Sequence, residues 1–245
     1  MDLLNHNLKE NLEFLHLKII AENFENSIEQ ATKNQTNYFD FLSALIADET
    51  IAKQDRAIER KIKLAKFPFM KSVADFDWNH AEINRQQVEN LLRLKFLEKN
   101  ENIVFLGNCG LGKTHLAIAI AEKACRKGHN VLFAGAVDII NDLLAAKEIN
   151  ALEKGLKKYI SPKLLVIDEL GYLPIDKLGA DMLFQVISKR YERGSIILTT
   201  NRQYNEWGHI FNNDNIVASA VLDRIMHHCE SVVIKGNSYR MKQAN

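Results

Sequence analysis

The chain has 245 residues, of which 47% are hydrophobic and 26% charged, and its formal net charge is +1. These values are typical of a soluble globular protein, and the near-zero charge means that any nucleic-acid contact must use a local basic patch. Three scattered cysteines exclude a disulfide framework or a cysteine-based zinc site, and no signal peptide or membrane-spanning apolar run is visible, so we expect a cytoplasmic protein without membrane contact.

The first part of the chain is predicted to be helical. Residues 1–106 contain no glycine and a single proline, Pro68, so the usual turn residues are missing. An amphipathic helix whose apolar stripe packs in a core is predicted from the spacing of Leu4, Leu8, Leu12, Leu15 and Ile19, with Phe24 and Ile28 continuing the face. We expect a break at 34–37 and a second helix over 38–47.

A basic stretch follows at 53–71. It contains seven lysines and arginines and two acidic residues, a local charge of +5. On charge alone, a solvated helix face and a surface that tracks DNA phosphates are equally good interpretations. Pro68 should end this helix. We expect a small all-α N-terminal domain over residues 1–72 and a second domain over 73–245. We also predict a helix at 82–97. It would either form one side of the pocket for a nucleotide base or only pack against the core.

The stretch from Ile103 to Gly128 has the pattern of a phosphate-binding loop. A short apolar strand leads into Gly107–Thr114, which fits G-x-x-x-x-G-K-[ST], and a helical segment follows. Backbone N–H groups at a helix N-terminus suit a polyphosphate, the lysine adds a positive charge, and the threonine hydroxyl can bind Mg²⁺. The predicted nucleotide-binding residues are Gly107, Asn108, Cys109, Gly110, Leu111, Gly112, Lys113, Thr114 and His115.

From Ile103 onward, strands and helices are predicted to alternate. The strand candidates are 103–106, 131–134, 164–167, 195–199 and 231–234. Helical stretches separate them, which is the signature of a parallel, doubly wound sheet with helices on both faces. Two helical stretches, 137–148 and 151–160, lie between the second and third strands, where a simple crossover needs only one.

Polar residues follow the third and fourth strands. The third ends in Asp168-Glu169, where Asp168 could hold Mg²⁺ and Glu169 could polarise a water for attack on a γ-phosphate. The fourth ends in Thr199-Thr200-Asn201, and a polar group there could orient that water. No guanine-reading Asn-Lys-x-Asp motif follows the fourth strand, so ATP is favoured over GTP.

Two later arginines lie outside the minimal phosphate loop. Arg224 and Arg240 are candidates for charge stabilisation across a subunit interface, because an arginine reaching a neighbour's γ-phosphate stabilises the transition state. The adjacent pair His227-His228 has no further ligand pattern nearby in the sequence, and we interpret both as ordinary histidines.

An ordered set of motifs resembles the IstB-like ATPases, helper proteins of insertion-sequence transposons related to DnaC and DnaA within the AAA+ class. The resemblance runs from about residue 40 to the end. It rests on Arg60–Phe69 followed by Phe76, Gly107–Ala117, Ile167–Tyr172, Ile197–Asn201, Leu222–Ile225 and Ser238–Arg240. It implies an AAA+ P-loop fold, a three-layer αβα sandwich with a five-stranded parallel sheet. In a departure from the family pattern, Asn108-Cys109 stands where proline or a small residue is more usual.

The resemblance also implies roles. Lys113 and Thr114 match the Walker A lysine and threonine, and Asp168 and Glu169 match Walker B, with Glu169 as the catalytic carboxylate. Asn201 resembles sensor 1. Arg224 resembles the arginine finger, and Arg240 resembles sensor 2. The helices between the second and third strands resemble the insertion with which initiator-type AAA+ proteins form spirals around DNA.

Three functions are weighed. The first is an ATPase that binds ATP and Mg²⁺, forms a homo-oligomer on duplex DNA, and delivers or activates a transposase at target DNA. The second is a DnaC-like helicase loader, which would use the same catalytic half, and the basic stretch ending in Phe-Pro-Phe favours the first. The third is a small-molecule kinase, which Asp168-Glu169, Asn201 and the late arginines argue against.

Overall fold

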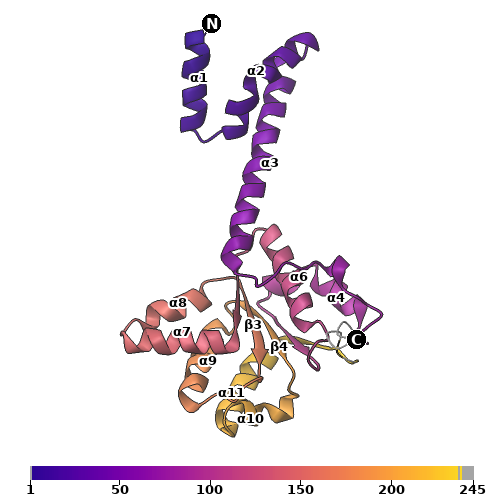
Figure 1. Ribbon diagram of the computed structural model, residues 1–245, viewed down its shortest axis with the longest axis vertical. Coiled ribbons are helices and arrows are strands. Elements are labelled where there is room, and N and C mark those ends of the chain that lie inside the picture. Colours follow the sequence, from indigo (N-terminus) through magenta and orange to yellow (C-terminus); the bar gives the residue numbers. More distant parts are fainter. Residues whose placement is uncertain (1, 237, 239–245) are drawn as a thin grey trace. The chain divides into compact units, whose positions relative to one another are not determined.

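The structure, a computed structural model, describes residues 2–236 and residue 238 (Figure 1). The chain forms two compact units, Met1–Arg60 and Lys61–Asn245. The domain boundary after residue 72, expected from the sequence, stays a prediction. Among the described helices, none has both the length and the apolar character needed to cross a membrane.

The N-terminal unit is built from α1 (Asp2–Phe14), α2 (Lys18–Lys33) and most of α3 (Tyr38–Ala65). The single amphipathic helix predicted there is wrong, because His16 adopts a left-handed backbone (φ 57°) that separates α1 from α2. The predicted core stripe is also largely wrong. Leu8, Leu15 and Ile28 are exposed, while Ile20, Ala21 and Phe24 are buried.

Helix α3 is longer than the sequence suggests. It continues beyond residue 47, where we expected an end, and absorbs the basic stretch up to Ala65, three residues before Pro68. The side chain of Glu49, only 2% exposed, accepts hydrogen bonds from the backbone N–H of Ile19 (2.7 Å) and Ile20 (3.2 Å). These N–H groups lie in the first turn of α2, where the helix itself offers them no acceptor. The Glu49 side chain of α3 therefore caps the start of α2.

The helix predicted at 82–97 is interrupted. The structure has the 3-10 helix η1 (Val73–Asp75), then α4 (Arg85–Leu91) and α5 (Lys95–Glu98). Leu94 between them is left-handed (φ 61°), so a continuous helix is impossible there. Glu82 instead pairs with Lys235 in an antiparallel bridge.

The second unit contains a five-stranded parallel sheet in the order β2-β3-β4-β1-β5. Each strand overlaps a predicted one, and the bounds are β1 (Asn102–Leu106), β2 (Val131–Gly135), β3 (Leu164–Leu170), β4 (Ser195–Thr200) and β5 (Cys229–Val233). Because all strands are parallel, the loops after β1, β3 and β4 emerge at one edge of the sheet. The phosphate-loop motif and the acidic and Thr-Thr-Asn segments therefore meet there.

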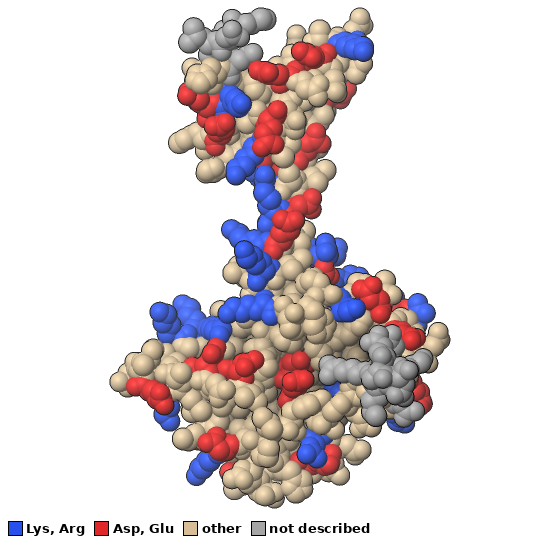
Figure 2. Space-filling view, viewed as in Figure 1, with Lys and Arg blue, Asp and Glu red and all other residues tan. Residues whose placement is uncertain are grey.

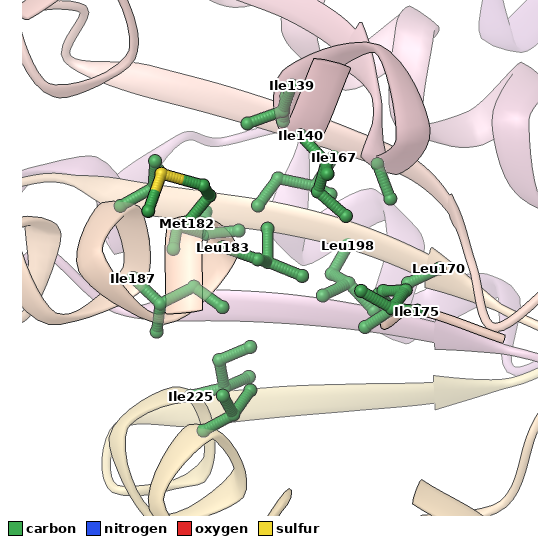
Figure 3. Close-up of a cluster of buried hydrophobic side chains, with 14 of the residues drawn as sticks. Ile139, Ile140, Ile167, Leu170, Ile175, Met182, Leu183, Ile187, Leu198 and Ile225 are labelled. Atoms are coloured by element: carbon green, nitrogen blue, oxygen red, sulfur yellow. The ribbon is translucent and has the colours of Figure 1, made fainter. Parts of the chain in front are cut away.

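Helices cover both faces of the sheet, which makes the predicted three-layer αβα sandwich. One buried cluster joins α6 (Lys113–Arg126), α4 and α5 to one face. The other face packs against α7 (Ala136–Glu148), α8 (Leu152–Ile160), α9 (Lys177–Arg190), α10 (Trp207–Ile210) and α11 (Asn215–Met226), the last two preceded by the 3-10 helix η2 (Tyr204–Glu206). In Figure 3, Leu183 of α9 lies near Leu198 of the sheet, and Ile225 of α11 belongs to the same buried cluster. Helices α7 and α8 both occupy the crossover from β2 to β3.

Candidate functional site

The loop between β1 and α6 can form only with glycines at two positions. Gly112 has φ 85°, and a Cβ atom there would lie 2.6 Å from Cε2 of Phe76. Gly107 has φ 156°, and a Cβ atom would lie 2.3 Å from the carbonyl oxygen of Ile234. Both the backbone conformation and the close neighbours exclude larger side chains, so the loop is held in a tight curve over the start of α6.

Lys113 lies inside this curve. It is the first residue of α6 and only 7% exposed. Its Nζ donates hydrogen bonds to the carbonyl oxygens of Gly107 (2.7 Å) and Asn108 (2.8 Å). A buried ammonium group surrounded by loop backbone, at the positive end of a helix dipole, is a strongly electropositive position that suits phosphate oxygens.

An oxygen cluster lies beside the loop. The hydroxyls of Thr114 (2.9 Å) and Thr199 (2.5 Å) both donate to Oδ1 of Asp168, which is 7% exposed. A carboxylate and hydroxyls are the oxygen ligands that Mg²⁺ prefers, so the donor set fits that ion. Thr114 and Asp168, predicted together from the sequence, are brought together. The part played by Thr199 was missed, although its position at the end of a buried strand beside the acidic pair was a usable signal.

Glu169 follows Asp168 but points elsewhere. Its backbone is left-handed (φ 60°), and the pairing of β3 with β4 shifts register between Ile167 and Leu170. The Glu169 N–H donates to the Thr199 hydroxyl oxygen (3.0 Å), and its exposed side chain lines the cavity next to the loop. The irregular strand end thus turns one acid inward to the oxygen cluster and leaves the other facing the cavity.

That cavity, about 330 Å³, is of the size of small-molecule sites. Five of the predicted loop residues line it together with Lys113, namely Gly110, Leu111, Gly112, Thr114 and His115. Segment 69–81 supplies further lining residues, whereas α4 and α5, which replace the helix predicted at 82–97, supply none. Phe76 contacts the His115 ring edge-on with centroids 5.5 Å apart, and Nε2 of His115 lies 2.7 Å from the Ser72 carbonyl oxygen.

Cys109 lies at the exposed top of the loop. The Tyr172 hydroxyl donates to its Sγ at 2.9 Å, which joins the phosphate loop to the segment after β3. Tyr172 ends the Ile167–Tyr172 motif, one of those on which the family resemblance rests, but no role of its own was predicted for it.

Asn201 does not line the cavity that Glu169 and Thr199 line. It lines a neighbouring hollow of about 600 Å³ together with Gly107 and Asn108. Its Oδ1 is buried and accepts no hydrogen bond from any described residue. An unpaired buried amide oxygen is costly, so a ligand or water at this position would satisfy it.

Arg224 is not part of this arrangement. Arg224 lies on α11, where its NH1 donates to the Ala220 carbonyl oxygen (2.9 Å) and its guanidinium lies 4.7 Å from the centroid of the Phe184 ring. It lines neither of the two cavities next to the loop. Arg240 lies outside the described residues.

Over residues 10–245 the chain matches the protein family described as IstB-like ATP binding protein. The chain belongs to this family. It is 41% identical to the ATP-binding protein of insertion sequence IS5376 from Geobacillus stearothermophilus, over 94% of this chain and 91% of that one. It is 42% identical to the IS232 ATP-binding protein from Bacillus thuringiensis subsp. berliner, over 96% and 94% of the two chains.

Solved structures share the fold of this IstB-like protein. A DnaI crystal structure aligns with a TM-score of 0.59 at 18% identity, over 71% of this chain and 93% of that one. AMPPCP-bound DnaA from Aquifex aeolicus aligns at 0.55 and 23% (70% and 52% covered), and the DnaC helicase loader at 0.52 and 24% (61% and 87%). At these identities the likeness establishes an AAA+ P-loop fold.

Proposed function

We propose that this IstB-like protein hydrolyses ATP with Mg²⁺ and uses its nucleotide state to assemble on duplex DNA, where it delivers or activates a transposase. The proposal rests chiefly on one observation. Oxygens of Thr114, Asp168 and Thr199 converge beside a phosphate loop that holds a buried lysine. Membership of a family of ATP-binding proteins, with relatives named for insertion sequences, supports both halves of the proposal.

Binding would use groups that are already in place. The N–H groups at the start of α6 and the Lys113 ammonium receive the phosphates, and segment 69–81 receives the base. Thr114 and Asp168 would hold Mg²⁺, which neutralises charge on the β- and γ-phosphates. Thr199 positions the Asp168 carboxylate through its hydrogen bond.

Hydrolysis would then need a base and a water. A water oxygen attacks the γ-phosphorus in line while the bond to the oxygen bridging the β-phosphate breaks, giving ADP and phosphate. Glu169, whose side chain faces the cavity, takes the proton from that water. The unpaired Oδ1 of Asn201 is a candidate acceptor that orients the water.

Assembly would complete the site. Arg224 lines neither cavity of its own subunit, so we propose that it acts on the nucleotide of a neighbouring subunit, as Arg240 is proposed to do. Such a divided site makes oligomerisation depend on ATP, and ATP turnover depend on oligomerisation.

ATPase rates and sedimentation with and without duplex DNA test this. Lys113→Ala should abolish nucleotide binding, Glu169→Gln should bind ATP and accumulate as an oligomer, and Arg224→Ala should bind ATP but turn it over poorly. Arg93→Ala, an exposed arginine that lines neither cavity, is the control. Normal turnover by an assembled Arg224→Ala variant would contradict the proposed action across the interface.

Duplex DNA would be contacted through the basic stretch on α3. Lysine and arginine side chains cluster along this helix (Figure 2). Part of this charge has a structural role, since Arg56 pairs with Glu49 at 3.0 Å and Lys61 donates to Oδ1 of Asn130 at 2.7 Å. The other lysines and arginines of the 53–71 stretch are exposed and would make the phosphate contacts, namely Lys53, Arg60, Lys63, Lys66 and Lys71.

A helicase loader is the alternative, since the DnaC helicase loader shares the fold. The relatives at 39–42% identity are named for insertion sequences, which favours a transposition helper. Capture of a cognate transposase rather than a replicative helicase from purified pairs would decide between them. Electron microscopy with ATP and duplex DNA should show a spiral or filament.

A further inference from the structure

Three metal-ligand side chains meet at the edge of the sheet where the strands begin, opposite the phosphate loop. Glu192 lies in the turn before β4, and His227 and His228 lie between α11 and β5. One potential ligand atom from each lies within 4.8 Å of the other two. The two histidines are adjacent in sequence, but Glu192 is 35 positions away, which is why the sequence pattern alone gave no ligand set.

The backbone that carries these residues is held in place by two asparagines. The Asn100 side chain donates to the carbonyl oxygen of Glu192 (2.9 Å). The backbone N–H of Asn102 donates to the carbonyl oxygen of His228 (2.7 Å), and its side-chain amide donates to that of Ile225 (3.0 Å). Residues 100–102 therefore hold the backbone of both loops, the one with Glu192 and the one with the two histidines.

Glu192 adopts a backbone conformation that a glutamate rarely takes. Its φ is 58°, in the left-handed region where glycine or asparagine is favoured. A glycine would fit this backbone conformation without strain, which makes Glu192→Gly a useful variant.

Tyr191 orients one of the imidazole rings. Its hydroxyl lies 2.9 Å from Nδ1 of His227, and the two histidine rings meet edge-on with centroids 4.2 Å apart. When Nδ1–H of His227 donates to the Tyr191 hydroxyl oxygen, Nε2 has no proton and can act as a ligand, the usual arrangement around histidine-bound metals.

The local electrostatics favour a cation. The site lies at the C-terminal end of α11, where the helix dipole is negative. All three candidate ligands are exposed, so their side chains can rotate inward and water can fill a remaining position.

We propose that Glu192, His227 and His228 form a binding site for a single divalent transition-metal ion, with Zn²⁺ as the best match. Two imidazoles and a carboxylate with an open fourth position suit zinc, whereas Mg²⁺ prefers oxygen ligands alone. The bound ion joins α11 to the turn between α9 and β4. This site is separate from the nucleotide site and does not depend on the function proposed above.

Zinc titration of the metal-free full-length protein, in competition with a chromophoric chelator, tests the site. We expect one equivalent to bind to the wild-type chain, and His227→Ala or His228→Ala to weaken the affinity by at least about tenfold. Glu192→Gly should weaken it similarly. Because glycine suits the left-handed backbone at this position, a loss of binding in this variant cannot be attributed to misfolding.

His209→Ala and Cys229→Ser are the matched controls, and both should bind zinc as the wild type does. His209 is an exposed histidine on α10, and Cys229 is the thiol next in sequence to the site. No stoichiometric binding by the wild type, equal affinity in all variants, or loss of binding in Cys229→Ser would overturn the assignment. Binding of Mg²⁺ with equal affinity would overturn the metal class.

Discussion

At the scale of single residues, the candidate site depends on side chains that orient other groups of the site through hydrogen bonds. Thr199 is the clearest example, because its one hydroxyl donates to Asp168 and accepts the N–H of Glu169. This hydroxyl thus holds the Asp168 carboxylate and the Glu169 backbone at the same time. The acids were predicted from the sequence, since two carboxylates after an apolar strand are a recognisable pattern. Their different directions were not predictable, because they arise from a register shift between β3 and β4.

Thr199→Val should therefore lower activity without removing any proposed ligand. Valine keeps the shape but loses the hydrogen bonds, so we expect magnesium-dependent ATP turnover to fall by about 10- to 100-fold. Steady-state rates across a magnesium titration would measure this. Thr50→Val, an exposed threonine on α3, should leave the rates unchanged.

The three cysteines should differ in reactivity. Burial raises the pKa of the Cys125 and Cys229 thiols to about 11, whereas Cys109 is exposed on the phosphate loop. Because the thiolate is the nucleophile, and its fraction falls about tenfold for each pH unit below the pKa, the Cys125 and Cys229 thiols should alkylate slowly at neutral pH.

Mass spectrometry after iodoacetamide treatment should therefore find rapid modification at Cys109 alone, and ATP should slow it. Equal labelling of Cys125, or labelling of Cys109 that ATP does not affect, would contradict this prediction.

Arg190 is a buried cation with no carboxylate partner among the described residues. It is 1% exposed and donates to five backbone carbonyl oxygens, those of Tyr159, Ile160, Pro162, Lys163 and Ser195. Burial lowers its pKa to about 10, which still leaves it charged at neutral pH.

Arg190→Met should lower the free energy of unfolding of the Lys61–Asn245 unit by about 3 kcal/mol, because several carbonyl groups lose their partner in a buried setting. Urea unfolding followed by circular dichroism would measure it. The exposed neighbour variant Lys189→Met should change stability by less than about 0.5 kcal/mol.

At the scale of elements, strands were easier to predict than helices. Each predicted strand overlaps an observed one, because short apolar runs between glycine-rich turns have few alternatives. Helix ends in the first hundred residues were harder to predict. The breaks at His16 and Leu94 use left-handed backbones at ordinary residues, which no turn signal announces. The continuity of α3 was missed because its middle carries no consistent apolar face.

The cap that Glu49 provides to α2 makes a prediction at this scale. Glu49→Ala should leave the N–H groups of Ile19 and Ile20 unpaired and release Arg56, so α2 should lose protection while α3 keeps its own hydrogen bonds. Hydrogen exchange should show faster exchange over Lys18–Lys33. Glu59→Ala, an exposed change on α3, should not alter it.

At the scale of the whole molecule, the chain is two units joined within one helix, since α3 runs through the division between Arg60 and Lys61. The sequence predicted a helical unit followed by a nucleotide-binding one, and the glycine distribution was the reason. It did not reveal which segment walls the nucleotide cavity, because segment 69–81 reaches the loop through tertiary packing.

Nucleotide binding should accordingly stabilise only one of the two units. At about one hundred times the dissociation constant, ATP should add about 2.7 kcal/mol to the Lys61–Asn245 unit. Hydrogen exchange should slow over 69–81 and 107–115, and remain unchanged over Asp2–Phe14. Slower exchange throughout the N-terminal unit would show that the two units respond together.

The two hydrogen bonds from Lys113 to its own loop carbonyls bear on selectivity. An anion that binds the Lys113 ammonium group must replace its two hydrogen bonds to carbonyl oxygens. It can do so only if its interaction with the ammonium group is stronger than theirs. A single sulfate or phosphate ion can replace these carbonyl oxygens but contacts only part of the loop, whereas a polyphosphate can reach the Lys113 ammonium and the N–H groups at the start of α6 together. We therefore expect the loop to prefer the polyphosphate of a nucleotide over small free anions.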